Sequence, residues 1–83
     1  MIDRICSLIG RYIGSEFIES RGYLIRAAGA ALDYESSLNL GHMRYCKQLL
    51  TNALMRVPYH HRRTAEEQIR PLIDEIENEY LEV

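Results

Sequence analysis

Apolar residues recur along most of the chain at the three- and four-residue spacing of amphipathic helices. When each residue is placed about 100° further around an axis, four segments gather their apolar side chains on one side, roughly residues 2–19, 23–35, 40–57 and 65–83. No segment alternates apolar and polar residues as a half-buried strand does, and the sequence has no Asn-Gly or Asp-Gly hairpin turn. The pattern therefore predicts an all-α fold, a small bundle or compact array of about four short helices, in a single helical domain over residues 1–83.

Residues with special backbone preferences mark the expected ends of these helices. Gly22 separates the first two segments, because glycine accepts the left-handed conformation that is common at helix C-termini. Asn39 is the expected N-cap of the third segment, and Pro58 ends that segment. Residues 64–67, Thr-Ala-Glu-Glu, match a capping box at the start of the fourth segment. Pro71 falls on the polar side of the fourth segment, where we expect a bend or a restart of the helix.

The first segment carries apolar side chains over about half of its circumference, more than a minimal amphipathic stripe. One neighbouring helix does not cover so wide an arc, and a chain this short gains stability by pairing, so we expect a homodimer. Glu16 falls inside the apolar arc. Either it is buried and pairs with Arg21 or Arg26, or the first helix ends near Gly14, or Glu16 lies at the rim of the arc.

The second and fourth segments differ in how their apolar residues are distributed, which predicts different positions in the fold. The second is rich in alanine and has only a narrow polar strip, so it is expected in the middle of the bundle. Leu81 lies opposite the apolar stripe of the fourth segment, so we expect it to tolerate substitution. That stripe consists of Ala65, Ile69, Leu72, Ile73, Ile76, Tyr80 and Val83.

Composition and charge narrow the class of protein. The chain has 83 residues, 47% of them hydrophobic and 27% charged, which fits one globular domain and excludes general disorder. It holds no apolar run near the ~18 residues that a membrane span needs. The formal net charge is only −2, but residues 36–65 contain five cations and no acid, whereas residues 66–83 carry a net charge of −6. The charge is therefore strongly polarised along the chain.

Two interpretations of this polarity are open. In the first, the third and fourth helices are antiparallel neighbours, and their charges simply flank the contact between them. In the second, the basic segment or the acidic tail meets a partner of opposite charge. Nine of the ten cations are arginine, which binds carboxylates and phosphates bidentately, and this favours recognition of a partner.

The polar side of the third segment is the expected contact surface. Arginine, tyrosine and methionine are enriched in protein interfaces, whereas a merely solvated face more often carries lysine and glutamate. The basic loop that follows leads into a helix N-terminus, which attracts anions, but Glu66 and Glu67 oppose an anion there. The expected partner-binding residues are Arg44, Tyr45, Gln48, Asn52, Met55, Arg56, Tyr59, His60, His61, Arg62 and Arg63.

The sequence offers little for catalysis or metal binding. His42 and Cys46 lie four residues apart and could complete a metal site with Cys6, but the chain has neither a C-x-x-C nor an H-x-x-x-H pair. It also has no Walker loop, dinucleotide-binding fingerprint or nucleophile elbow. We therefore expect no enzymatic activity, no catalytic residue, no cofactor and no metal.

Together these features predict a small non-enzymatic protein-interaction module that acts as an inhibitor, an adaptor or a regulatory subunit. Such a module would suit an accessory regulator of a bacterial or mobile-element system. The alternative is a nucleic-acid-binding regulator that uses the third helix and the basic loop 60–63. The N-terminus, Met1-Ile2-Asp3-Arg4, lacks the basic start and the cleavage site of a signal peptide, which predicts a cytoplasmic location without membrane contact.

Overall fold

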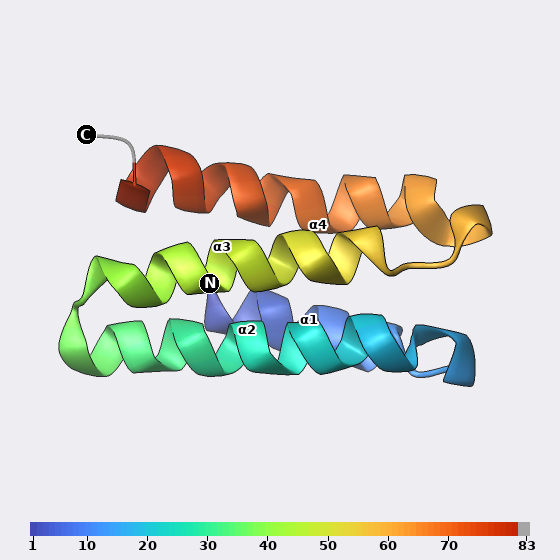
Figure 1. Cartoon of the computed structure of the whole chain (residues 1–83), viewed down its shortest axis with the longest axis horizontal. Helices are drawn as coiled ribbons and strands as arrows, with labels where there is room; N and C mark the ends of the chain where they lie inside the picture. Colours follow the sequence, from blue (N-terminus) through green and yellow to red (C-terminus); the bar gives the residue numbers. More distant parts are fainter. Residues whose placement is uncertain (82–83) are drawn as a thin grey trace.

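The protein is built from four α-helices joined by short turns, as its computed structural model shows (Figure 1). The structure describes residues 1–81, and this part of the chain contains no strand, so the predicted all-α fold is confirmed. The helices are α1 (Ile2–Arg11), α2 (Ile18–Ser37), α3 (Leu40–Met55) and α4 (Arg62–Ile76). The shorter elements are the 3-10 turns η1 (Ser15–Phe17) and η2 (Tyr59–His61) and the π-helical segment η3 (Glu77–Leu81).

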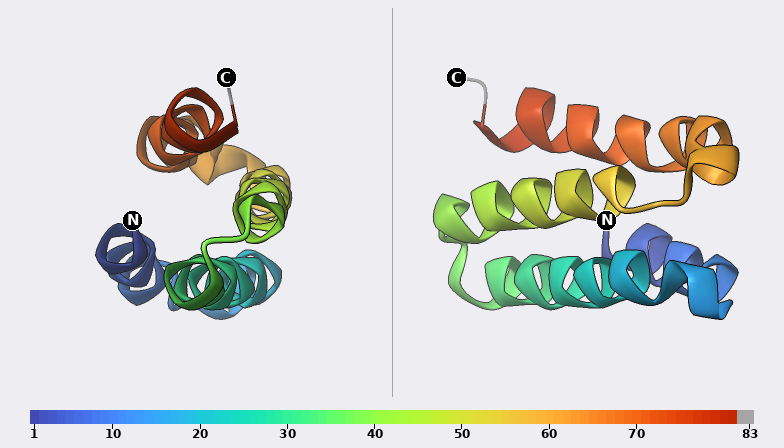
Figure 2. Two further views of the ribbon diagram at one scale, coloured as in Figure 1. Left: turned by 90° about the vertical axis from the view of Figure 1, so that its left-hand side faces the viewer. Right: turned by 45° about the vertical axis from the view of Figure 1, so that its right-hand side comes forward.

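Consecutive helices run antiparallel and lie side by side in chain order (Figure 1). Viewed along their length, the four helices follow an open arc in which α2 and α3 are central and α1 and α4 are at the two ends (Figure 2). The sequence left open whether the helices form a bundle or a compact array. The structure shows an up-and-down antiparallel bundle. It also places the N-terminal helix opposite the C-terminal one across the open side of the arc.

The contact between α2 and α3 is made by small side chains. Ala27, Ala30 and Ala31 of α2 are buried against α3, where Ala53 is also buried. The hydroxyl of Ser20, which is fully buried, donates a hydrogen bond of 2.9 Å to the carbonyl oxygen of Ala53. Small residues allow two helices to approach closely, and the hydrogen bond satisfies the buried hydroxyl.

Polar contacts tie α1 to α4 across the open side of the arc. The guanidinium of Arg4 forms an ion pair with the carboxylate of Glu75. Tyr12 is buried, and its hydroxyl donates a hydrogen bond of 2.8 Å to Oε1 of Gln68. Beneath these contacts lie the buried Ile5, Leu8, Ala65, Ile69, Leu72, Ile73 and Ile76, which confirms most of the predicted stripe of the fourth segment, while Val83 lies outside the described residues.

The predicted boundary between the first two helices is wrong. α1 already ends at Arg11, η1 follows, and Gly22 lies inside α2. Nη1 of Arg21 donates a hydrogen bond of 2.9 Å to the carbonyl oxygen of Ile13, in the turn that follows α1. Gly14 is extended (φ −63°, ψ 160°), and Glu16 is exposed on η1. The alternative in which the first helix ends near Gly14 is therefore the correct one.

The predicted capping box is also wrong, because α4 begins at Arg62, two residues before Thr64. The chain enters α4 directly from η2, in which the amide of His61 donates to the carbonyl oxygen of Pro58 at 2.9 Å. No side chain caps the first turn of α4. The carboxylates of the proposed box pair instead along the helix, Glu66 with Arg70 at 3.0 Å and Glu67 with Arg63 at 3.9 Å.

The signals at the two ends of α3 are confirmed. Oδ1 of Asn39 accepts a hydrogen bond of 2.8 Å from the amide of Gly41, as an N-cap does. The helix ends at Met55, three residues before Pro58. The buried residues of α3, from Met43 to Leu54, lie on the apolar side that the sequence predicted.

At the C-terminus the structure departs from a regular helical wheel. α4 continues through Pro71 without a restart, and Pro71 is exposed, so no buried donor is lost there. Beyond Ile76 the helix widens into the π-helical segment η3, whose hydrogen bonds join residues five apart. In such a segment each residue turns by less than 100° about the helix axis. Leu81 consequently packs against the core instead of facing solvent, and the prediction of its opposite orientation is wrong.

Candidate functional site

The outer face of α3, turned away from the core, carries most of the residues that the sequence selected. Arg44, Tyr45, Gln48, Met55 and Arg56 are exposed, while Asn52 is half-buried. Tyr45 and Met55 expose 52% and 59% of their surface, as several other large apolar side chains of this protein do. The periodicity of α3 therefore predicted correctly which residues face outward.

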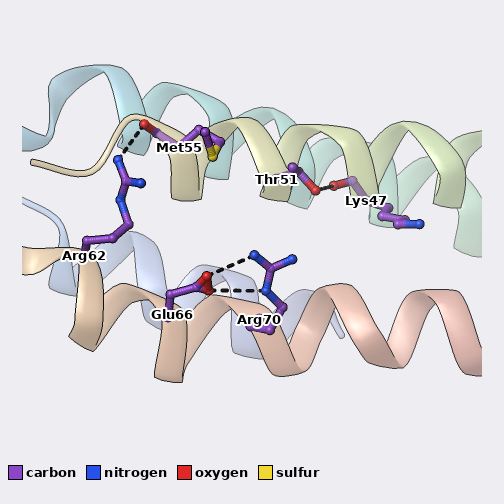
Figure 3. Close-up of polar contacts among 6 residues, drawn as sticks. All are labelled: Lys47, Thr51, Met55, Arg62, Glu66 and Arg70. Atoms are coloured by element: carbon purple, nitrogen blue, oxygen red, sulfur yellow. Dashed lines mark hydrogen bonds and ion pairs between the residues drawn. The ribbon is translucent and has the colours of Figure 1, made fainter. Parts of the chain in front are cut away.

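An open groove runs between this face and the C-terminal end of the bundle, with a volume of about 470 Å³. Five of its residues come from α3, and Leu81 comes from η3. Figure 3 shows Lys47, Thr51 and Met55 along one side of α3, opposite charged residues of α4. The complete lining is Arg44, Lys47, Gln48, Thr51, Asn52 and Leu81.

Sequence reasoning missed half of this groove. Lys47 and Thr51 lie between the apolar and polar sides of α3, and the sequence does not show that the neighbouring helix leaves them open. The side chain of Thr51 is turned back onto the helix, where its hydroxyl donates to the carbonyl oxygen of Lys47 at 2.9 Å (Figure 3). Leu81 reaches the groove only because η3 is π-helical, a change of register for which the sequence carries no recognised signal.

Arg56 belongs to a different neighbourhood from the groove. Its guanidinium carbon lies 4.8 Å from the centroid of the Tyr23 ring, and its Nε lies 3.7 Å from a carboxylate oxygen of Glu19. Both partners are on α2. Arg56 thus links α3 to α2 by a cation–π contact and an ion pair, and its charge is partly engaged within the molecule.

Arg62 has a structural role that its place in a basic loop did not suggest. Its Nη2 donates a hydrogen bond of 2.9 Å to the carbonyl oxygen of Met55 (Figure 3). It donates another, of 3.1 Å, to the carbonyl oxygen of Val57. The carbonyls at the C-terminus of a helix lack partners within the helix, so Arg62 satisfies the end of α3 from the first residue of α4. Arg63, its neighbour, is almost fully exposed and lies near Glu67.

The other predicted residues of the loop, Tyr59, His60 and His61, lie on two different sides of the protein. Tyr59 is 89% exposed and lines a shallow depression with His60, Arg62 and Arg63. His61 turns the other way and stacks edge-on against Phe17 with a centroid separation of 5.0 Å. The structure therefore does not gather the eleven predicted residues into one site. It brings Arg44, Gln48 and Asn52 together in the groove, with Tyr45 and Met55 beside them on the same helix.

Most cations of the basic segment are engaged by other parts of the protein. Lys47 Nζ lies 3.5 Å from Oε1 of Glu77, which joins the basic helix to the acidic C-terminal segment. Arg56 and Arg63 also have carboxylate neighbours, and Arg62 binds backbone carbonyls. Within residues 1–81, Arg44 is the one cation of the basic segment for which no ion pair or hydrogen bond is found.

Cys46 is placed as a core residue. Its side chain is fully buried, and its thiol donates to the carbonyl oxygen of Ala27 at 3.4 Å. Burial raises the pKa of this thiol to about 11, so the thiolate that a nucleophile or a metal ligand requires is disfavoured. Cys6 is exposed on α1. In the described part of the chain, no three His, Cys, Asp or Glu side chains come together in a way that could hold a metal ion.

Comparisons with known proteins add no assignment. No protein-family model, no curated protein and no solved structure matches this chain significantly. Among residues 1–81, none of the helices combines the length and the apolar character required to cross a membrane.

Proposed function

We propose that this chain is a non-enzymatic protein-interaction module, acting as an inhibitor, an adaptor or a regulatory subunit, and that it binds its partner on the outer face of α3. The observation that carries the proposal is the exposure of Tyr45 and Met55 beside a groove lined by Arg44, Gln48 and Asn52. Aromatic, methionine and arginine side chains are the types enriched in protein interfaces.

The chemistry of the groove describes the partner. Its lining contains two cations, two amides and one hydroxyl, and it ends at the apolar side chain of Leu81. Among residues 1–81 no group engages the guanidinium of Arg44, which can hold a carboxylate bidentately. The groove therefore suits an amphipathic segment, such as a helix, that places an acidic residue at Arg44, one apolar residue against Leu81 and another against Met55 at the far end of α3.

A nucleic-acid ligand is the second candidate, and one observation favours it. Arg44, Gln48 and Asn52 share the groove, and these side chains are the types that bind base edges in the major groove of DNA. Two other observations weigh against it. Lys47, Arg56 and Arg62 are already engaged within the protein, and the acidic helix of residues 66–81, with a net charge of −5, adjoins the groove and repels a polyanion.

Selection from a displayed library of short random peptides tests the proposal. We expect enriched peptides that combine acidic and apolar residues and bind the folded protein. Tyr45→Ala and Arg44→Ala should each weaken that binding by roughly 10- to 30-fold, as loss of an interface hot spot does. Tyr59→Ala is the matched control, because Tyr59 is more exposed than Tyr45 but lies on η2, and it should change affinity less than about twofold.

A gel shift with mixed DNA and RNA at physiological salt decides between the candidates. The protein-binding proposal predicts no shift at tens of micromolar protein, whereas specific nucleic-acid binding occurs in the nanomolar range, on the order of 10⁻⁸ M or tighter. Arg63→Glu combined with Arg44→Glu is the variant to include, because Arg62 is needed for the end of α3. A shift that this variant abolishes would replace our proposal by the second candidate.

A further inference from the structure

Within residues 1–81, α2 has a second apolar side whose large side chains the bundle leaves exposed. At about 100° per residue, the residues of this side fall within about 80° of one another, directly opposite the buried Leu24, Ala27 and Ala31. Ile18, Ile25 and Leu32, which recur every seven residues, expose 60%, 53% and 56% of their surface. We call the set Ile18, Gly22, Ile25, Gly29, Leu32 and Ser36 the α2 stripe.

Large and small residues alternate along the α2 stripe. Gly22 and Gly29 separate the large side chains, and a Cβ atom placed on either glycine would meet nothing within 4 Å. Neither glycine has a positive φ, so the backbone there does not require glycine. Two glycines in the middle of a helix cost stability, roughly 1 kcal/mol each relative to alanine. Gly22 and Gly29 leave space on this face of α2 that side chains of another protein molecule can fill.

We propose that the α2 stripe is a self-association surface, on which α2 of a second copy of this chain packs antiparallel. In this register Ile25 of one copy lies over Gly29 of the other, Leu32 over Gly22 and Ile18 over Ser36. Every large side chain thus meets a small one, as ridges-into-grooves packing requires. The two-fold axis passes near residue 27, close to the middle of α2 (Ile18–Ser37), so the full lengths of both helices overlap.

The charges beside the stripe support the antiparallel direction. The N-terminal half of α2 carries Glu19, Arg21 and Arg26, a net charge of +1, and the C-terminal half carries Asp33 and Glu35, a net charge of −2. Antiparallel pairing places each half beside the oppositely charged half of the other copy. Parallel pairing would place the two acidic halves together and would align the two helix dipoles unfavourably.

The size of the surface fits a reversible dimer. Two helices of about 30 Å in contact along their length bury on the order of 1,000 Å², near the lower limit for a specific interface. We therefore expect dissociation in the micromolar range. The proposal is independent of the function proposed for α3, because the α2 stripe lies on another helix and shares no residue with the groove.

Sedimentation equilibrium on the full chain tests the dimer. Wild type should show a monomer–dimer equilibrium at micromolar concentration, and Ile25→Lys should weaken association at least 30-fold. Gly29→Leu discriminates better between misfolding and loss of the dimer. It should raise the thermal stability of the monomer, because leucine favours the helix, and it should prevent association, because the new side chain fills the space that Ile25 of the second copy would occupy. Gly10→Leu is its control, since Gly10 is an exposed glycine on α1 with nothing within 4 Å of an added Cβ, and it should leave the dimer intact.

Oxidative cross-linking tests the direction. In a background with the exposed Cys6 replaced by Ser, Ser36→Cys alone should not cross-link, because the two positions lie about 27 Å apart in the antiparallel dimer. Ser36→Cys mixed with Ile18→Cys should cross-link. A wild type that stays monomeric to millimolar concentration, a dimer that survives both Ile25→Lys and Gly29→Leu, or efficient cross-linking of Ser36→Cys to itself would each overturn the proposal.

Discussion

Two arginines, Arg21 and Arg62, each bind a backbone carbonyl oxygen where one helix passes into the next. Each lies near the start of a helix and donates to a backbone carbonyl oxygen near the end of the preceding one, Arg21 to Ile13 in the turn after α1 and Arg62 to Met55 at the last residue of α3. A guanidinium carries five donors in a fixed planar arrangement, so it can satisfy more than one such carbonyl at once. Arg62 thus satisfies the end of α3 without a glycine there.

The first prediction follows from Arg62. Arg62→Met keeps most of the aliphatic chain but removes the hydrogen bonds to Met55 and Val57, which should lower the free energy of unfolding by about 1–3 kcal/mol. Urea denaturation followed by circular dichroism measures the change. Arg63→Met is the control, since its exposed side chain should contribute less than about 0.5 kcal/mol. Equal losses for the two variants would show that the carbonyl contacts of Arg62 do not stabilise the fold.

At the scale of the element, α4 shows how far a local rule can be overridden. Proline inside a helix removes a hydrogen bond and normally bends or breaks the helix. α4 nevertheless continues across Pro71, because Ile69, Leu72, Ile73 and Ile76 around it are buried in the core. Pro71 itself faces solvent beside α1, where water can satisfy the freed carbonyl of Glu67.

Pro71→Ala should therefore stabilise the protein. Alanine restores the missing hydrogen bond. Of the difference of about 3 kcal/mol in helix propensity we expect roughly 1–2 kcal/mol, because the packed bundle already holds this part of α4 in helical geometry. A rise in the midpoint of thermal unfolding checks the result. Thr64→Ala, an exposed position in the first turn of α4, should change stability less. A lowered midpoint in Pro71→Ala would mean that the shape imposed by proline is needed for packing against α1.

At the scale of the whole molecule, the open arc of helices is held at its two ends by few contacts. The Arg4–Glu75 ion pair is one of them, and the hydrogen bond from Arg4 is the main cause that holds the pKa of Glu75 below its ordinary value of 4.5, while burial acts in the opposite direction. Because the pKa is lower in the folded state, ionised Glu75 stabilises the fold above pH 4.5, and this contribution is lost as the pH falls below that value.

Glu75→Gln should accordingly cost less than about 1 kcal/mol near pH 7, since both side chains are partly exposed. The difference from wild type should shrink as urea denaturation is repeated at progressively lower pH below 4.5, because Glu75 then becomes protonated. Glu67→Gln, on the same helix and paired more distantly with Arg63, is the control and should have a smaller effect at neutral pH. A difference that persists undiminished at acid pH would assign the loss to packing and not to charge.

The sequence by itself determined the helical class, the core faces of α3 and α4 and the two ends of α3. These follow from local physics, since apolar spacing, an N-cap such as Asn39 and a stop such as Pro58 act within a few residues of the chain. The same periodicity predicted which side of α3 faces outward, including Tyr45 and Met55. The periodicity could not show that Arg56 and Arg62 bind groups within the protein whereas Arg44 faces outward, because the groups that Arg56 and Arg62 bind lie on other elements.

Only the tertiary structure decided where α1 ends, where α4 begins and what Leu81 contacts. Arg21 of α2 binds the turn that follows α1, the turn η2 leads straight into α4 without the capping box, and the π-helical segment places Leu81 in the groove. The exposed apolar side of α2 was equally hidden, because a wheel shows two apolar sides but not which one the bundle covers. In each case the deciding contact joins elements distant in the chain, and no local pattern encodes which elements will meet.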